Sequence, residues 1–232
     1  MCIRDRYIYG VLEYTYKNGY ADVIYAWDVV NEAADENQYD GLRRSYWYQI
    51  IGPDYLYYAF LYAREAETLY AKQYASLYGL DADTDDLSSI QPKLFYNDYN
   101  EWFGSRSDAI IHFLTEEPWN ENHEKVKSSV INPDGDGTIY GDGLLDGIGM
   151  QGHLDDTQNI EQYMIALEKY NAAVPELHIT ELDIGRTGTD ANANYYQAKF
   201  YYEFFSRLIE EVKKGVNLTC LLYTSDAADD MQ

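Results

Sequence analysis

The sequence predicts an α/β fold built on a parallel sheet. Short runs rich in β-branched and aromatic residues alternate with segments whose apolar residues recur at helical spacing. Such alternation is typical of repeated βα units, in which a helix joins each strand to the next parallel strand. At 232 residues, the chain is long enough to form one large domain with its own core.

The first elements are a helix at 7–17 and a strand at 23–30, and a long amphipathic helix follows over 52–79. Pro53 suits the first turn of that helix, and Gly79 suits its end. Apolar side chains recur on one of its faces at Leu56, Ala59, Phe60, Ala63, Tyr70, Tyr74 and Leu77. We therefore expect this helix to pack against the sheet.

The second half continues the alternation and ends in a further strand. The predicted elements are a strand at 93–98, a helix near 106–116, a polar loop at 119–143, a strand at 144–151, a helix whose apolar face runs from Ile160 to Tyr170, a strand at 176–181, a helix at 193–214 and a strand that begins at Val216. The loop is rich in Asn, Gly and Asp, and loops of that length are often functional.

Two terminal segments, 1–6 and 220–232, are predicted to be non-native. The letters MCIRD at the start and CLLYTS near the end can be encoded by one DNA element read on opposite strands, and that element resembles a sequencing-library adapter. We therefore expect an incomplete domain over 7–219. Cys2 and Cys220 both lie outside it, so we expect no disulfide, cysteine nucleophile or cysteine metal site.

The composition favours a neutral partner. A formal net charge of −23 argues against nucleic acid and against an anionic membrane surface. No apolar stretch approaches the ~20 residues that a membrane-spanning helix needs. The 26 tyrosines carry rings with a polar edge, which suit the faces of sugars, although many of them are expected in the core.

Four predicted strands finish in polar side chains, at Asn31-Glu32, Asn97-Asp98, Gln151-Gly152-His153 and Glu181-Leu182-Asp183. In a parallel α/β barrel the carboxyl ends of all strands meet at one face, where active sites are assembled. Two of these clusters supply a glutamate, and cleavage of a glycosidic bond requires a facing pair of carboxyl groups. Mutual repulsion then raises the pKa of one member, which becomes the acid.

Each of these residues also has a plainer interpretation. Glu32 alone would more often cap a helix or pair with a cation, and the same holds for Glu181. Asp98 is as consistent with local hydrogen bonds in its loop as with contact to a substrate. A single histidine such as His153 would more often be a hydrogen-bonded core residue. The longer patterns around the two glutamates favour the catalytic interpretation.

Four motifs occur in order at these strand ends: WDVVNEA (27–33), FYNDYN (95–100), GIGMQGHL (147–154) and HITELDI (178–184). Together they resemble glycoside hydrolase family 10, the retaining endo-β-1,4-xylanases. The resemblance implies a partial TIM (β/α)8 barrel that runs from helix three to the start of strand eight. It implies that Glu32 is the general acid/base and that Glu181 is the nucleophile.

The same resemblance implies a set of residues that contact the substrate: Asn31, Gln151, His153, Asn97, Tyr99 and Asn100. His153 and Asp183 are expected to position Glu181, with Asp183 acting through the histidine. No cofactor and no catalytic metal are implied. The expected substrate is xylan or a related plant β-glycan, and the expected location is extracellular.

Two alternatives to the xylanase remain open at this point. One is a retaining β-glucanase on the same barrel, and the other is a non-catalytic carbohydrate-binding or calcium-stiffened module. Asn132, Asp134 and Asp136 resemble the opening of an EF-hand loop, but Gly143 stands where a bidentate acid is expected. Because the first three strands of the family's barrel are missing, we expect the isolated chain to be poorly folded and inactive.

Overall fold

The computed structural model describes residues 3–116, 122 and 137–222. Within them, one sheet contains six strands, and every pairing is parallel. The strands are β1 (Ala26–Asn31), β2 (Lys93–Asp98), β3 (Gly147–Met150), β4 (His153–Asp155), β5 (Leu177–Gly185) and β6 (Leu218–Leu222). The predicted α/β fold with a parallel sheet is confirmed.

The spatial order of the strands follows their order along the chain. β2 lies between β1 and β3, and β5 lies beside both β3 and β6. β3 pairs with the first part of β5, and β4 pairs with the last part of β5. β3 and β4 therefore lie one after the other along the same edge of β5. Consecutive parallel neighbours are the arrangement of a βα barrel, which agrees with the predicted partial barrel.

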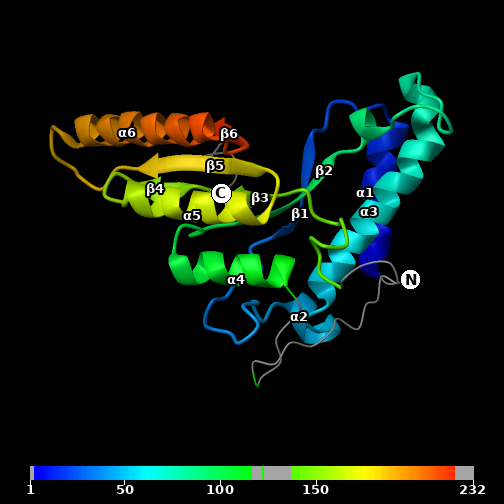
Figure 1. The fold of residues 1–232 in the computed structure, drawn as a ribbon, viewed down its shortest axis with the longest axis horizontal. Helices are drawn as coiled ribbons and strands as arrows, with labels where there is room; N and C mark the ends of the chain where they lie inside the picture. The colour runs from blue at the N-terminus through cyan, green and yellow to red at the C-terminus, as the bar shows by residue number, and fades with distance from the viewer. Residues whose placement is uncertain (1–2, 117–121, 123–136, 223–232) are drawn as a thin grey trace.

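Helices separate the strands along the chain. They are α1 (Ile3–Lys17), α2 (Tyr46–Ile51), α3 (Tyr55–Tyr74), α4 (Gly104–Thr115), α5 (Ile160–Ala173) and α6 (Ala193–Lys214), with short 3-10 helices at Ala75–Tyr78 and Ser88–Ile90. Figure 1 shows α1 and α3 side by side near β1 and β2, while α5 and α6 flank β5. The layers are therefore helix against sheet, as repeated βα units require.

The core lies between the sheet and these helices. Leu94, Ile148 and Ile179 of the central strands are at most 1 % exposed, as expected for parallel strands that are covered on both faces. Phe204 of α6 and Tyr163 of α5 join the same apolar cluster. Several tyrosines are thus core residues, in line with the plainer interpretation of that composition.

Most of the predicted elements are confirmed with small shifts of their bounds. β2 and α6 cover the predicted residues, whereas the helix predicted over 52–79 is α3 followed by a 3-10 turn. α2 is a separate short helix that the sequence did not reveal, and the side chain of Ser45 accepts a hydrogen bond from its first turn. β5 continues past the predicted end to Gly185, where its last residues pair with β4.

The terminal elements extend into the segments predicted to be non-native, because α1 begins at Ile3 and β6 ends at Leu222. Within the described ranges, β1 pairs with β2 alone. The calcium hypothesis concerns Asn132, Asp134 and Asp136, which lie outside the described residues. Among the helices of the described part, none is long and apolar enough to cross a membrane.

Candidate active site

Glu32 directly follows β1 in a strained backbone conformation that is held by hydrogen bonds. Its φ angle is +56°, which is uncommon for a residue other than glycine. The Glu32 N–H donates to the carbonyl of Asn97 at 2.9 Å, and the Ala33 N–H donates to the hydroxyl of Tyr96 at 3.0 Å. The Ala34 N–H donates to Asp98 Oδ2 at 3.1 Å. The end of β2 therefore fixes the chain around Glu32.

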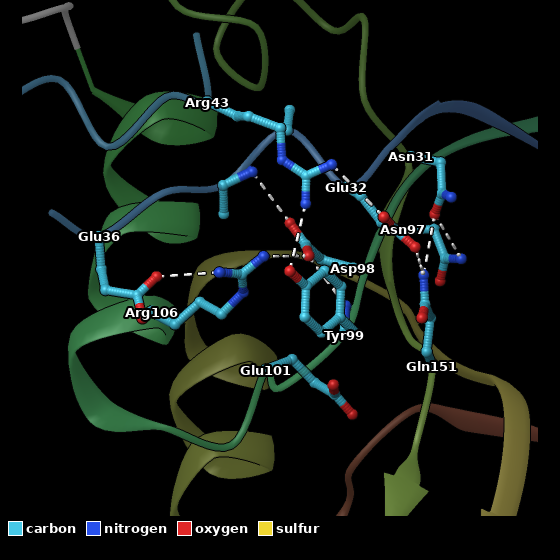
Figure 2. Close-up of polar contacts among 12 residues, drawn as sticks. Asn31, Glu32, Glu36, Arg43, Asn97, Asp98, Tyr99, Glu101, Arg106 and Gln151 are labelled. Atoms are coloured by element: carbon cyan, nitrogen blue, oxygen red, sulfur yellow. Dashed lines mark hydrogen bonds and ion pairs between the residues drawn. The ribbon is translucent and has the colours of Figure 1, made fainter. Parts of the chain in front are cut away.

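Amide side chains connect Glu32 to Glu181. Asn97 Nδ2 donates to Glu181 Oε1 at 2.9 Å and to Asn31 Oδ1 at 3.1 Å. Gln151 Nε2 donates to the same Asn31 oxygen at 3.1 Å and to Glu32 Oε1 at 3.3 Å. Figure 2 shows Asn31, Asn97 and Gln151 gathered beside Glu32. The structure thus brings both glutamates, which lie far apart in the sequence, to one polar cluster. Glu32 directly follows β1, but Glu181 lies in the middle of β5 and not at a strand end, because β5 continues to Gly185 in its pairing with β4.

The two carboxyl groups are accessible while the amides beneath them are covered. The side chains of Glu32 and Glu181 are 35 % and 34 % exposed. Asn97 and Gln151 are each only 2 % exposed. Two partly exposed carboxyl groups that are held by buried amide side chains can contact a solvated substrate and keep their geometry.

Thr180 fixes the orientation of the Asn97 amide. Its hydroxyl donates to Asn97 Oδ1 at 2.7 Å, so the NH2 end of the amide faces Glu181 and Asn31. Gly149 leaves the space for this side chain, because a Cβ at position 149 would lie 2.5 Å from Asn97 Oδ1. Both supporting residues lie within the matched motifs, but their roles depend on cross-strand packing that the sequence does not display.

His153 links Glu181 to Asp183. Its Nε2 lies 3.3 Å from Glu181 Oε2 and its Nδ1 lies 3.1 Å from Asp183 Oδ2. β4 and β5 place His153 opposite Asp183 in the sheet register. A carboxylate beside Nδ1 favours the tautomer that carries its proton there. The relay expected from the sequence is therefore present as a geometry.

Arg43 is a neighbour of Glu32 that the sequence did not identify. Its Nη1 lies 3.5 Å from Glu32 Oε2, and its Nη2 donates to the hydroxyl of Tyr99 at 3.2 Å. In Figure 2 the guanidinium of Arg43 lies between these two groups. Tyr99 thus joins the site through Arg43. Asn100 has a left-handed backbone with φ of +50°.

Asp98 is buried below the site and does not face a substrate. It is 0 % exposed and accepts hydrogen bonds from Ala34 N–H, from Tyr99 N–H at 2.9 Å and from the Tyr96 hydroxyl. Arg106 Nη2 donates to its other side at 2.7 Å, as Figure 2 shows. These contacts favour the loop-orienting interpretation of Asp98 over direct substrate contact.

A cavity of about 350 Å³ lies next to Glu181, and Asp28, His178 and Thr180 also line it. Removal from water and the charge of Glu181 raise the pKa of Asp28 to about 6. Asp28 lies in the middle of β1, so the pattern of polar residues at strand ends does not indicate it. It adds a second acidic group to the surroundings of the nucleophile candidate.

The described residues contain no group of three or more His, Cys, Asp or Glu side chains arranged to hold a metal ion. Residues in or beside the site that the sequence did not indicate are Arg43, Arg106, Thr180 and Asp28. Only a structural pairing, and no local pattern, would have found most of them.

Comparison with known proteins gives consistent matches. Endo-1,4-beta-xylanase A of Thermotoga neapolitana is 39 % identical over 197 residues, which cover 84 % of this chain and 14 % of that protein. Exoglucanase XynX of Acetivibrio thermocellus is 33 % identical and matches 82 % of this chain and 13 % of that protein. The crystal structure of TsXylA, an intracellular xylanase from Thermoanaerobacterium saccharolyticum, superposes with a TM-score of 0.67 at 30 % identity and covers 94 % of this chain.

The chain corresponds to a part of each of these proteins. It spans 54 % of the TsXylA chain and a smaller share of the two longer relatives. The family model described as Glycosyl hydrolase family 10 matches residues 5–223, which is nearly the whole sequence. The resemblance of the four strand-end motifs is thereby confirmed. The chain belongs to glycosyl hydrolase family 10.

Proposed function

We propose that this chain carries the catalytic glutamates of a retaining endo-β-1,4-xylanase, which cleaves internal bonds of xylan. The observation that carries the proposal is the amide bridge from Glu32 through Gln151, Asn31 and Asn97 to Glu181. Such a bridge holds two carboxyl groups at a fixed relation on one rim. The xylanases among the relatives support xylan as the substrate class.

The contacts of the two glutamates suit different roles. Glu181 is held on both oxygens, by the Asn97 amide at 2.9 Å and by His153 at 3.3 Å, so it presents a fixed carboxylate to an anomeric carbon. Glu32 has no counterpart of the 2.9 Å bond among the described residues, since its contacts are 3.3 Å to Gln151 and 3.5 Å to Arg43. A group that must give and take a proton needs that freedom.

In the first step, Glu32 donates its proton to the glycosidic oxygen while a Glu181 oxygen bonds to the anomeric carbon. The carbon–oxygen bond to the leaving sugar breaks, and a covalent glycosyl-enzyme forms. In the second step, Glu32 removes a proton from water, whose oxygen bonds to the anomeric carbon. The bond to Glu181 then breaks, and both glutamates return to their starting states with retention of configuration.

The exposure of each side chain indicates which residues of the site can contact the substrate. Asn31 and His153 are exposed enough to meet sugar hydroxyls, and Tyr99 and Asn100 are half-buried at the rim of the site. Asn97 is buried, and its amide already serves Thr180, Asn31 and Glu181. We therefore assign Asn97 to positioning and not to the direct substrate contact expected from the sequence. The 2 % exposure of Gln151 likewise favours support of Glu32 and Asn31, with contact limited to its edge.

The test is product stereochemistry and turnover in the full-length protein. Proton NMR of early xylan products should show the β-anomer before mutarotation. Glu181→Gln and Glu32→Gln are each expected to lower kcat by about 10²- to 10⁴-fold. Glu203→Gln, which changes an exposed carboxyl group on α6, is the matched control and should keep normal turnover. Early appearance of the α-anomer would contradict the retaining mechanism.

An activated substrate separates the two roles. An aryl xyloside whose leaving group departs without protonation does not need the acid in the first step. Glu32→Ala should therefore still release one equivalent of aryl product in a burst and then stall. Glu181→Ala should show no burst. The opposite pattern would exchange the two assignments.

A retaining β-glucanase is the second candidate, because one relative of similar identity is named Exoglucanase XynX. Both activities use the same carboxyl pair, so the catalytic variants do not discriminate them. The ratio of kcat/KM on xylan to kcat/KM on β-glucan in the full-length protein does. We expect xylan to be preferred, and a preference for glucan would favour the alternative.

We propose an extracellular location, since xylan is a polymer outside the cell. TsXylA is described as an intracellular xylanase, so an intracellular location is the alternative. Activity in culture medium compared with washed lysed cells tests the proposal. Activity confined to the lysate would place the enzyme with short xylo-oligosaccharides as its substrates.

A further inference from the structure

Glu101 is a fully buried carboxyl group directly beneath the candidate active site. It follows the FYNDYN motif, is 0 % exposed, and receives a hydrogen bond on Oε1 from the N–H of Gly152 at 3.0 Å. Its other oxygen, Oε2, has no hydrogen-bond partner among the described residues. Figure 2 shows the side chain below Asp98 and Arg106. A buried carboxyl oxygen without a hydrogen bond is rare in folded proteins.

The residue that Glu101 holds lies between two residues of the site. Gln151 precedes Gly152 and donates to Glu32, while His153 follows it and contacts Glu181. The main chain of Gln151 is itself fixed, because its N–H donates to the Asp98 carbonyl and its carbonyl accepts from Glu181 N–H, both at 2.9 Å. The bond from Gly152 to Glu101 is the remaining anchor of this turn.

The turn itself has little freedom to adjust. Gly152 has a φ of +78°, and a Cβ there would lie 2.9 Å from Ile179 Cγ2. Glycine is required for both reasons. A small displacement of Gly152 would therefore be transmitted to Gln151 and His153, which lie on opposite sides of it.

The charges around Glu101 leave it without a cation of its own. Arg106 on α4 is the nearby guanidinium, and it already pairs with Asp98 at 2.7 Å and with Glu36 at 2.9 Å. On α5, the Tyr170 hydroxyl donates to the main-chain carbonyl of Glu101, so it offers nothing to the carboxyl group. An ionised Glu101 would be a second buried anion beside Asp98. Burial above all, and then Asp98, raise the pKa of Glu101 to about 8, against the lowering effects of the nearby N–H groups and Arg106.

We propose that Glu101 is a positioning residue that, as a neutral carboxylic acid, holds Gly152 so that Gln151 and His153 reach the two catalytic glutamates. The assignment rests on the proposed glycoside hydrolase function of that pair. Loss of the Glu101 proton places an unpaired charge in a closed interior; the Gly152 N–H stabilises that charge only in part, so ionisation favours local opening of the 151–153 turn to water. The turn thus couples activity to an ionisation that takes place away from the substrate.

The sign of the pH effect follows from proton binding. The pKa of Glu101 is raised from 4.5 to about 8, so the folded chain keeps a proton that the unfolded chain has released. The contribution of Glu101 to the free energy of unfolding therefore falls as pH rises from about 4.5 to about 8, and it is constant above that range. Glu101→Gln is permanently neutral and keeps an oxygen for the Gly152 N–H, so it removes this dependence.

The experiment uses the full-length protein with Glu101→Gln and with Glu203→Gln as an exposed control. The difference in Tm between Glu101→Gln and the native protein should grow as pH rises through this window, whereas the control difference should stay flat. The ratio of kcat/KM at pH 9 to that at pH 6.5 should be about tenfold higher in Glu101→Gln than in the native protein. Parallel pH profiles for all three proteins would overturn the assignment.

Hydrogen exchange of the native protein gives a measurement that does not depend on a variant that folds. After correction for intrinsic rates, protection of the Gly152 amide should fall as pH rises from about 4.5 to about 8, relative to the Ile148 amide, which donates to the Glu176 carbonyl. A constant ratio of the two would sink the proposal. Xylan hydrolysis with an unaltered Glu101→Gln profile would remove Glu101 and leave the proposed function standing. A falling Gly152 protection without hydrolysis would remove the function alone.

Discussion

The hydroxyl of Thr180 donates to Asn97 Oδ1 at 2.7 Å, and this bond decides which end of the Asn97 amide faces the nucleophile candidate. The NH2 end then donates to Glu181 at 2.9 Å. An amide that turned over would present its oxygen to a carboxylate and repel it. A residue without any role in the chemistry thus determines the electrostatic surroundings of Glu181.

Thr180→Val removes this hydroxyl and keeps the shape of the side chain. We expect the free energy of unfolding to fall by about 1 kcal/mol, the usual net value of one hydrogen bond. We also expect kcat to fall while KM changes little, because the carboxylate loses its fixed orientation. Thr68→Val on the exposed face of α3 is the matched control for the same chemical change. Normal kcat in Thr180→Val would show that Asn97 keeps its orientation by other means.

Gly149→Ala is expected to be costly in the same region. The added methyl group would lie 2.5 Å from Asn97 Oδ1 and 3.0 Å from Thr180 Cγ2. Overpacking of this kind destabilises by about 1–3 kcal/mol. Gly10→Ala in α1 meets nothing within 4 Å and should stabilise its helix slightly. Chemical denaturation of both variants measures the contrast, and equal effects at the two positions would contradict the packing described here.

Arg106→Gln tests the ion pair beneath the acid/base candidate. Arg106 is 5 % exposed and bonds to both Asp98 and Glu36. Loss of one partner of a buried pair costs about 3–5 kcal/mol, because the other charge stays buried. The exposed Arg186→Gln is the comparison and should cost much less. Urea unfolding gives both values, and a loss below about 1 kcal/mol for Arg106→Gln would contradict a stabilising role of this buried pair.

At the end of the sheet opposite the active site, the pKa shifts of Glu176 and His178 predict a loss of stability in acid. Burial alone would raise the pKa of Glu176, but hydrogen bonds from Lys93, Tyr25 and His178 lower it below 4.5. Burial lowers the pKa of His178 below 6.5, against the attraction of Glu176. In both cases the unfolded chain binds more protons in acid. Stability is therefore lost first as pH falls below 6.5, through His178, and then below 4.5, through Glu176.

Glu176→Gln checks the second of these losses. At neutral pH the variant is expected to be less stable by about 1.5–3 kcal/mol, the value of hydrogen bonds to a charged group. The gap between the native protein and the variant should close as pH falls below 4.5. Glu168→Gln on the exposed side of α5 should show almost no gap at any pH. A gap that widens in acid would reverse the sign derived above.

The sequence predicted the periodic elements and the residues at strand ends. β2 and α6 were predicted with their observed bounds because each has an uninterrupted pattern and a clear stop, such as Gly215 after α6. α2 escaped prediction because it buries no residue, so it has no apolar stripe to detect. β4 escaped because it is a three-residue continuation of β3 beyond Gly152.

Site residues were predictable only where the chain itself concentrates polar groups. Glu32 and Glu181 stand out because each carboxyl group follows an apolar run inside a longer motif, WDVVNEA or HITELDI. Arg43 and Arg106 reach the site from a loop and from α4, and their partners are set by tertiary folding. Glu101 is one residue beyond a recognised motif, and nothing in the sequence reports that it is buried. The contacts of Arg43, Arg106 and Glu101 are visible only in the three-dimensional structure.

Because Gly149 has no side chain, the choice of residue at position 149 of β3 is coupled to the choice at position 97 of the neighbouring β2. Asn97 occupies the volume that a residue at 149 would otherwise fill. A larger residue at 149 becomes tolerable only when position 97 becomes smaller, and that exchange removes the amide that Glu181 depends on. Paired replacement at 97 and 149 is therefore expected to rescue folding without restoring turnover.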